Sequence, residues 1–243
     1  MLSSKRTLSA FSLLILVCVS ISFAQSARRA PAGGARAVVV DERLAVLRDD
    51  PSLSSRLLQR MSRGRAVAVL STKRSPEGLT FYRVAVTRRT RGWLQSDAVV
   101  VAGRAGEDER LLRLIRGSED FDLVARARIF LDLFPRSPLR PAVLLLYGEA
   151  AEEAAQRLSR DATRRLAERE MKAGGAPVFS YFMNYNGLDR YRRQDIVFTF
   201  DAVKKQFHYD GAAWREILQR YPRSSEAAEA RKRLESLAAR DVR

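Results

Sequence analysis

Two residue types that carry much of enzyme chemistry occur only once each in this chain, as Cys18 and His208. A cysteine peptidase needs a thiol with a histidine base, and a catalytic zinc site usually takes two or three histidines. Cys18 lies in an N-terminal segment that we expect to be removed. Asp210 follows His208 by two residues, but this pair alone identifies no nucleophile. We predict no catalytic residue, metal site or cofactor, and interpret His208 as an ordinary strand residue.

Paired carboxylates offer a second route to catalysis, because two of them can cleave a glycosidic bond. Glu149, Glu152 and Glu153 are spaced to share one helix face. On an arginine-rich helix, such residues are usually exposed and balanced by partners such as Arg157. The sequence also has no phosphate-binding loop and no dinucleotide glycine pattern. We therefore predict that the protein is not an enzyme.

The N-terminal residues 1–24 have the three-part pattern of a cleavable secretory signal. A short basic start precedes an almost wholly apolar run from Leu8 to Phe23, and Ser22-Phe23-Ala24 places small residues at the −3 and −1 positions. We predict cleavage near Ala24–Gln25, a secreted or periplasmic location and no transmembrane segment afterwards. An uncleaved membrane anchor is the alternative. Residues 25–36 are small and basic and predict a flexible tether.

The composition is that of a folded protein with a strong positive charge. The 243 residues are 46% hydrophobic and 30% charged, with a net charge of +16. Without Lys5 and Arg6 the chain keeps 42 basic and 28 acidic residues, a net charge of +14. Such a surface attracts polyanions, which outside the cytoplasm are anionic lipids, lipopolysaccharide phosphates and peptidoglycan carboxylates. The alternative is a general arginine bias, because no run of five like charges occurs. We expect no nucleic acid partner.

Residues 37–103 alternate short apolar runs with turn signals such as Asp49-Asp50-Pro51-Ser52 and Ser75-Pro76-Glu77-Gly78. Short strands at this spacing are typical of a small antiparallel barrel or sandwich. The runs that predict strands are 37–40, 44–47, 66–70, 81–86 and 92–94.

Four features of this region resemble the bacterial SH3-like (SH3b) domains. They are the run from Leu44 to Ser52 with its proline, the Gly64-x-x-Val67 strand, Tyr82-Arg83-Val84 and the closing Gly92-Trp93-Leu94. The chain departs from the family where Ala45 replaces an asparagine, where Leu47 is an extra residue before Arg48, and where Phe81-Tyr82 replaces a Gly-Trp pair.

The resemblance implies a small β-barrel at residues 37–103 that binds peptidoglycan or a peptide. The matching positions imply that Arg48, Tyr82 and Trp93 contact the ligand. The alternative for Trp93 is a place in the barrel core.

Residues 107–243 change to a helical period of about 3.6 residues. The segments Phe130–Ser137 and Ile217–Ser224 align without gaps, and each has an aromatic-Pro-Arg-Ser corner between two helical stripes. These corners resemble those of tetratricopeptide-type (TPR-like) repeats in periplasmic and outer-membrane assembly proteins, which implies a groove that docks a protein partner. We expect Ser137 to cap a helix that continues to about Met171, before Gly174-Gly175.

The insertion at residues 177–210 holds nine aromatic residues, and part of it alternates in the manner of a β-hairpin. The rings either fill the groove left by too few repeats or form a platform for sugars or peptides.

Together these patterns predict an α+β multidomain protein, with a small antiparallel SH3-like barrel followed by a TPR-like helical domain. The favoured function is that of a non-enzymatic envelope protein that binds an envelope protein partner and peptidoglycan or a peptide. The alternatives are an assembly subunit without a small ligand and a charge-driven polyanion binder. The sequence indicates no oligomeric state.

Overall fold

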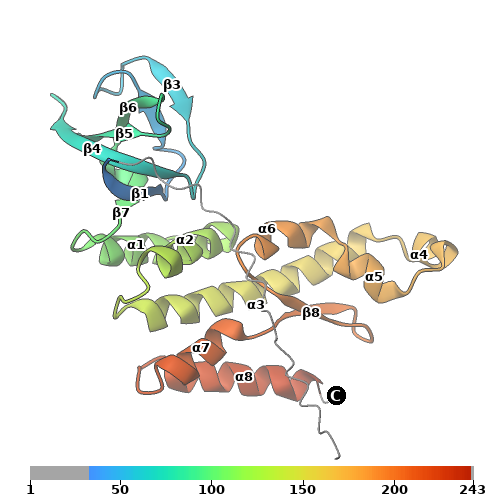
Figure 1. Cartoon of the computed structure of the whole chain (residues 1–243). Coiled ribbons are helices and arrows are strands. Elements are labelled where there is room, and N and C mark those ends of the chain that lie inside the picture. Colours follow the sequence, from blue (N-terminus) through green and yellow to red (C-terminus); the bar gives the residue numbers. More distant parts are fainter. Residues whose placement is uncertain (1–32, 242–243) are drawn as a thin grey trace, which may run out of the picture.

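The computed structural model describes residues 33–241, so the predicted signal and most of the predicted tether lie outside the described residues. The chain is an α+β protein, as expected, with an antiparallel sheet at one end of a layer of helices (Figure 1). Among the described residues, no helix has both the length and the apolar character needed to cross a membrane.

The sheet contains seven antiparallel strands in the order β3-β2-β6-β5-β4-β1-β7. All five predicted runs contribute strands, and β3 and β7 are additional. In the described residues the hydrogen-bonded ladder stays open between its edge strands β3 and β7, so a closed barrel is not seen. The strand bounds are β1 Ala35–Val39, β2 Val46–Arg48, β3 Leu57–Arg60, β4 Ala66–Arg74, β5 Thr80–Ala85, β6 Arg91–Gln95 and β7 Val99–Val101.

Gly92 of β6 allows strand β2 to approach β6 closely. A Cβ atom at this position would lie 2.6 Å from the Arg48 carbonyl oxygen and 2.8 Å from Cγ of Leu47. Contacts this short do not occur between real side chains and backbone, so glycine is required for the observed spacing. The close approach places Arg48 directly opposite Trp93 in the ladder.

The remaining elements form the helical part of the chain. Helices α1, α2, α3, α7 and α8 pack successively, each against the next in this order (Figure 1). Their bounds are α1 Glu107–Arg116, α2 Asp120–Leu133, α3 Arg140–Arg165, α7 Ala212–Arg220 and α8 Ala227–Asp241. Between α3 and α7 the chain forms α4 Glu168–Gly174, α5 Val178–Met183, α6 Asp189–Arg192 and the predicted hairpin of β8 Phe198–Asp201 and β9 Gln206–Tyr209.

The two aligned corners have the same backbone hydrogen-bond pattern. In the first, Phe134 N–H donates to the Phe130 carbonyl (2.9 Å) and Ser137 N–H to the Phe134 carbonyl (3.2 Å). In the second, the equivalent bonds join Tyr221 to Ile217 (2.8 Å) and Ser224 to Tyr221 (3.0 Å). The repeat detected in the sequence therefore corresponds to a repeated backbone structure, with α3 of the first hairpin packed on α7 of the second.

Two predicted boundaries of the long helix are wrong. Helix α3 begins at Arg140 with Leu139 as its N-cap. The Ser137 hydroxyl accepts the Leu139 amide at 3.2 Å in the turn before the helix and donates to Asp108 on α1 at 2.7 Å. The helix also ends at Arg165, because Leu166 adopts an extended conformation (φ −85°, ψ 102°). A separate helix, α4, then runs to the predicted stop at Gly174.

One side of the sheet packs against the helices, while the curled sheet also encloses a separate buried cluster of its own. Val38, Val40 and Val100 belong to the same buried cluster as residues of the helices. Arg126 of α2 is only 4% exposed, and its Nε atom donates to the Val40 carbonyl at 3.0 Å. Its Nη1 atom donates to the Ser118 hydroxyl at 2.6 Å. Because burial disfavours the charged form, the pKa of Arg126 is lowered from its ordinary value.

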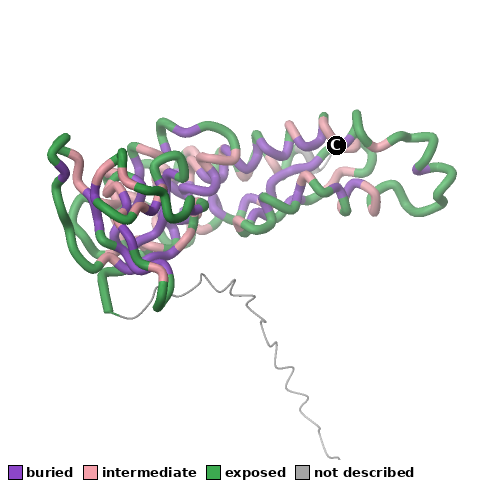
Figure 2. Tube along the Cα trace, turned by 90° about the horizontal axis from the view of Figure 1, so that it is seen from above, coloured by how far each residue is buried: buried purple, intermediate pink, exposed green. Residues whose placement is uncertain are grey.

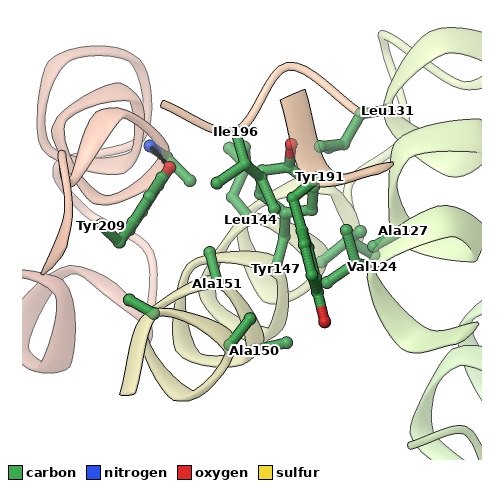
Figure 3. Packing of buried hydrophobic residues seen from close by; sticks show 14 of the residues in the cluster. Val124, Ala127, Leu131, Leu144, Tyr147, Ala150, Ala151, Tyr191, Ile196 and Tyr209 are labelled. Atoms are coloured by element: carbon green, nitrogen blue, oxygen red, sulfur yellow. Dashed lines mark hydrogen bonds between the residues drawn. The ribbon is translucent and has the colours of Figure 1, made fainter. Parts of the chain in front are cut away.

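The aromatic-rich insertion packs against α3 and forms part of this core. Tyr191, Ile196 and Tyr209 lie around Leu144 and Tyr147 of α3 (Figure 3). Buried positions continue through this region (Figure 2). The core-filling interpretation therefore describes most of the aromatic rings in the insertion, of which the buried ones are Phe182, Tyr185, Tyr191, Phe198, Phe207 and Tyr209.

Side chains of α3 occupy the outer edge of β9. The Ser159 hydroxyl accepts a hydrogen bond from Phe207 N–H at 2.7 Å, and Glu152 Oε2 accepts one from Tyr209 N–H at 3.0 Å. These two amides point away from β8 and would otherwise be unsatisfied in the buried interface. The two bonds fix the hairpin to the helix.

Candidate functional site

A row of side chains crosses the sheet at Arg48, Trp93 and Arg83. Arg48 of β2 is the ladder partner of Trp93 of β6, and Trp93 is the partner of Arg83 of β5. Directly opposed residues of antiparallel strands project from the same face. Leu57 of β3 extends the row, since it is the partner of Arg48. Arg83 and Leu57 are exposed, whereas Arg48 and Trp93 are half-buried.

The charges along this row are free to meet a ligand. Neither Arg48 nor Arg83 forms an ion pair with a carboxylate in the part of the chain that the structure describes. Arg60 and Arg91 lie on the same face by register, are exposed, and also have no such pair among the described residues. The face therefore presents four unneutralised guanidinium groups around one indole ring.

The loop after β2 holds the guanidinium group of Arg48 in place. Arg48 Nη1 donates to the Ser55 carbonyl at 2.6 Å. The Ser55 hydroxyl in turn contacts the carbonyl oxygens of Asp50 and Ser52, each at 2.8 Å. A cation fixed in this way loses little side-chain freedom when a ligand binds.

Tyr82 lies on the opposite face of the sheet from Trp93. Its ladder partner is Leu94, and both residues belong to the buried cluster that the curled sheet encloses. The Tyr82 ring is 6% exposed, its hydroxyl accepts a hydrogen bond from Arg104, and the Arg104 guanidinium lies 5.8 Å from the ring centroid. The structure thus brings Arg48 and Trp93 together and places Tyr82 apart from them, in the core.

The acidic residues of α3 have separate partners. Glu149 pairs with Arg233 at 2.8 Å, and Glu153 pairs with Arg157 at 3.7 Å. Glu152 differs from the expectation of an exposed residue, because it is 8% exposed and its Oε1 atom lies 3.6 Å from Nδ1 of His208. The three carboxylates do not converge on one substrate position.

His208 lies in β9, as predicted, and contacts Glu152 across the α3 interface. Ser159, on the same helix as Glu152, has a hydroxyl that donates to the Ala155 carbonyl at 2.7 Å and accepts from Phe207 N–H. Its hydrogen bonds therefore go to the backbone. In residues 33–241, no group of three or more His, Cys, Asp or Glu residues is placed to hold a metal ion.

Comparison with protein-family models, with curated proteins and with solved structures gave no match for this chain. The site must therefore be interpreted from its own residues.

Proposed function

We propose that this protein is an exported, non-enzymatic component of the cell envelope. In this proposal its SH3-like sheet binds carboxylate-bearing peptides of the cell wall, and its TPR-like helices hold a protein partner. The observation that carries the proposal is the row of Arg48, Trp93 and Arg83 on the outer face of the sheet.

The chemistry of the row fits peptide stems of peptidoglycan. Guanidinium groups bind carboxylates through paired N–H donors, and these stems carry free carboxylates. Trp93 lies between the two arginines and offers an apolar ring to the hydrocarbon part of the stem. Leu57, which is 46% exposed, extends the apolar surface to the edge strand.

The helical part supports the second half of the proposal through α8. This helix is the last of the packed series within the described residues: it packs mainly on α7, and its Arg233 also pairs with Glu149 of α3. Ala227 and Ala230 are buried on that side, while Lys232 and Glu235 lie on exposed or partly exposed positions. A further helical element of a partner protein would continue the stack.

Cosedimentation with purified peptidoglycan tests the wall-binding half. The mature protein, residues 25–243, is mixed with sacculi, and its bound fraction is measured at low and moderate salt. We expect Trp93→Ala and Arg83→Ala to weaken retention about tenfold, as expected for loss of a central interface residue. Arg88→Ala is the matched control, because it removes an equal charge from the exposed β5–β6 turn.

Two results would overturn the wall-binding proposal. One is a wild-type protein that is not retained at either salt concentration. The other is equal retention of the Trp93→Ala and Arg88→Ala variants, which would show that binding follows the net charge and not the row.

A further inference from the structure

A second surface lies between the C-terminal half of α3 and the β8–β9 hairpin. The inference drawn from it is independent of the proposed wall binding. Two adjoining hollows of about 420 Å³ each share Ser159, Arg160 and Gln206 in their walls. Arg164, Lys204 and Lys205 line one of the two hollows, and His208 lines the other. Among the described residues, no acidic side chain lines either hollow.

The cationic groups come from two separate elements and converge on this space. Arg160 is exposed and has no ion pair within the described residues. Arg164, Lys204 and Lys205 contact carboxylates on the rim, with Lys205 Nζ 3.7 Å from Glu168 and Lys204 Nζ 3.3 Å from Asp201. These pairs are at least partly exposed to solvent, so an anionic ligand can compete for the cations.

One of the two hollows is lined by His208, whose ring has a nitrogen atom without a hydrogen-bond partner among the described residues. His208 is 8% exposed, and its Nδ1 atom has no hydrogen-bond partner among the described residues. The Glu152 carboxylate lies beside it, with its Oε1 atom 3.6 Å from Nδ1 of His208.

Lys205 lies in the turn between β8 and β9 and lines the second hollow. Its φ angle is +55°, in the left-handed region that favours glycine and disfavours residues with a Cβ atom. It ends the tight turn between β8 and β9, in which the Asp201 carboxylate accepts the Val203 and Lys204 amides at 2.9 and 3.0 Å. Lysine at this position costs backbone strain, and it places one more ammonium group at the hollow.

We infer that the two adjoining hollows form one site that binds a phosphate group, with Arg160, Lys204 and Lys205 as its principal cationic donors. A phosphate dianion carries more charge than one carboxylate and accepts hydrogen bonds from several directions, which suits cations that approach from a helix and a turn. The phosphate belongs either to a soluble phosphomonoester or to a lipid headgroup.

Binding measurements on the mature protein test this inference and separate the two sources. One arm titrates glucose 1-phosphate, with inorganic phosphate as a second probe, in a zwitterionic buffer of low salt. The other arm uses phosphatidylcholine vesicles with and without phosphatidic acid. Binding in the first arm supports a soluble phosphomonoester, and binding only to vesicles that contain phosphatidic acid supports a lipid headgroup. Binding in neither arm overturns the inference.

The decisive variant is Lys205→Gly. Relief of the left-handed strain should raise its Tm by about 3 °C, while loss of the ammonium group should weaken phosphate binding at least fivefold. Arg160→Gln should weaken binding to a similar degree, and Arg88→Gln, with the same charge change far along the sequence, should not. Equal weakening by Arg88→Gln, or unchanged affinity in both hollow variants, would overturn the inference. None of these variants alters the Arg48–Trp93–Arg83 row.

Discussion

The indole ring of Trp214 lies directly over Gly148, in the middle of α3. A Cβ atom at position 148 would overlap the indole nitrogen, so the glycine creates the space that the ring occupies. Trp214 is 1% exposed and packs edge-to-face on Tyr209, with their ring centroids 5.4 Å apart. This one contact joins α7, α3 and the β8–β9 hairpin.

We predict that Gly148→Ala will lower the free energy of unfolding by about 2 kcal/mol, because the added methyl group overpacks the interface. In a Trp214→Ala background the space is empty, so the same change should be neutral or stabilise by up to ~1 kcal/mol through helix propensity. Urea denaturation of the four proteins in this cycle measures the coupling. An equal cost in both backgrounds would contradict the described contact.

The close approach of β2 and β6 leads to a second prediction. Gly92→Ala should cost about 2 kcal/mol of stability, since its methyl group would meet the Arg48 carbonyl and the Leu47 side chain. It should also reduce the proposed wall binding, because Arg48 and Trp93 would move apart. Gly117→Ala is the control, as the nearest atom to its Cβ would be at an ordinary 3.6 Å. Stability is measured by thermal or urea unfolding, and equal effects of the two substitutions would refute the prediction.

Substitution of the buried Arg126 tests how strongly the sheet is attached to the helices. Arg126→Ala leaves the Val40 carbonyl and the Ser118 hydroxyl without this partner and opens a cavity, so we expect a loss of about 3 kcal/mol. Arg128→Ala, two residues later, removes partly exposed pairs with Asp132 and Asp195 and should cost less than Arg126→Ala, about 1 kcal/mol.

Hydrogen exchange provides the additional measurement for Arg126→Ala. The variant should expose amides of β1 and β7 before those of α3, because its contacts join the sheet to α2. Protection that falls uniformly along the chain would show that Arg126 stabilises the fold without serving this interface.

The ionised Asp41 side chain should make the free energy of unfolding depend on pH. The hydrogen bond from the Arg43 side chain lowers the pKa of this buried carboxyl group below its ordinary value of 3.8. A carboxyl group with a lowered pKa in the folded state favours folding above its unfolded pKa, and this advantage is lost as the pH falls through the folded pKa. Asp41→Asn should therefore destabilise the protein at pH 7, and the difference from wild type should shrink below about pH 4. Urea midpoints across this range check the prediction, with the exposed Asp50→Asn as the control.

The sequence pattern identified the parts of the fold that depend on local periodicity. Helix α1 and the corners around Pro135 and Pro222 lie where proline, glycine and apolar spacing predict them. Strand β3 was not predicted, because all four of its residues are exposed and it has no apolar alternation. The break at Leu166 also lacks a glycine or proline signal, and the residue packs against the main core after the helix ends.

The candidate sites depend more strongly on tertiary structure. The resemblance to SH3-like domains selected Arg48 and Trp93, which the ladder makes neighbours. It could not separate Tyr82, because the face on which a strand residue lies depends on register. The hollow at α3 was not predicted at all. Arg160 and Lys205 are 45 positions apart, and neither one lies in a recognisable motif.

Side chains from helices bind the outer backbone amides of two edge strands, and this limits which edge is open to an additional strand. Glu107 of α1 accepts the Val101 amide of β7 at 3.2 Å, much as Ser159 and Glu152 of α3 occupy the outer amides of β9. Both edges are thereby closed to β-augmentation by a peptide or a second copy. Strand addition to the seven-stranded sheet is directed instead to β3, the edge next to Arg48, where Leu57 and Leu58 are exposed. If the proposed peptide binding at the Arg48–Trp93–Arg83 row is correct, β3 is the edge strand that lies beside the bound peptide.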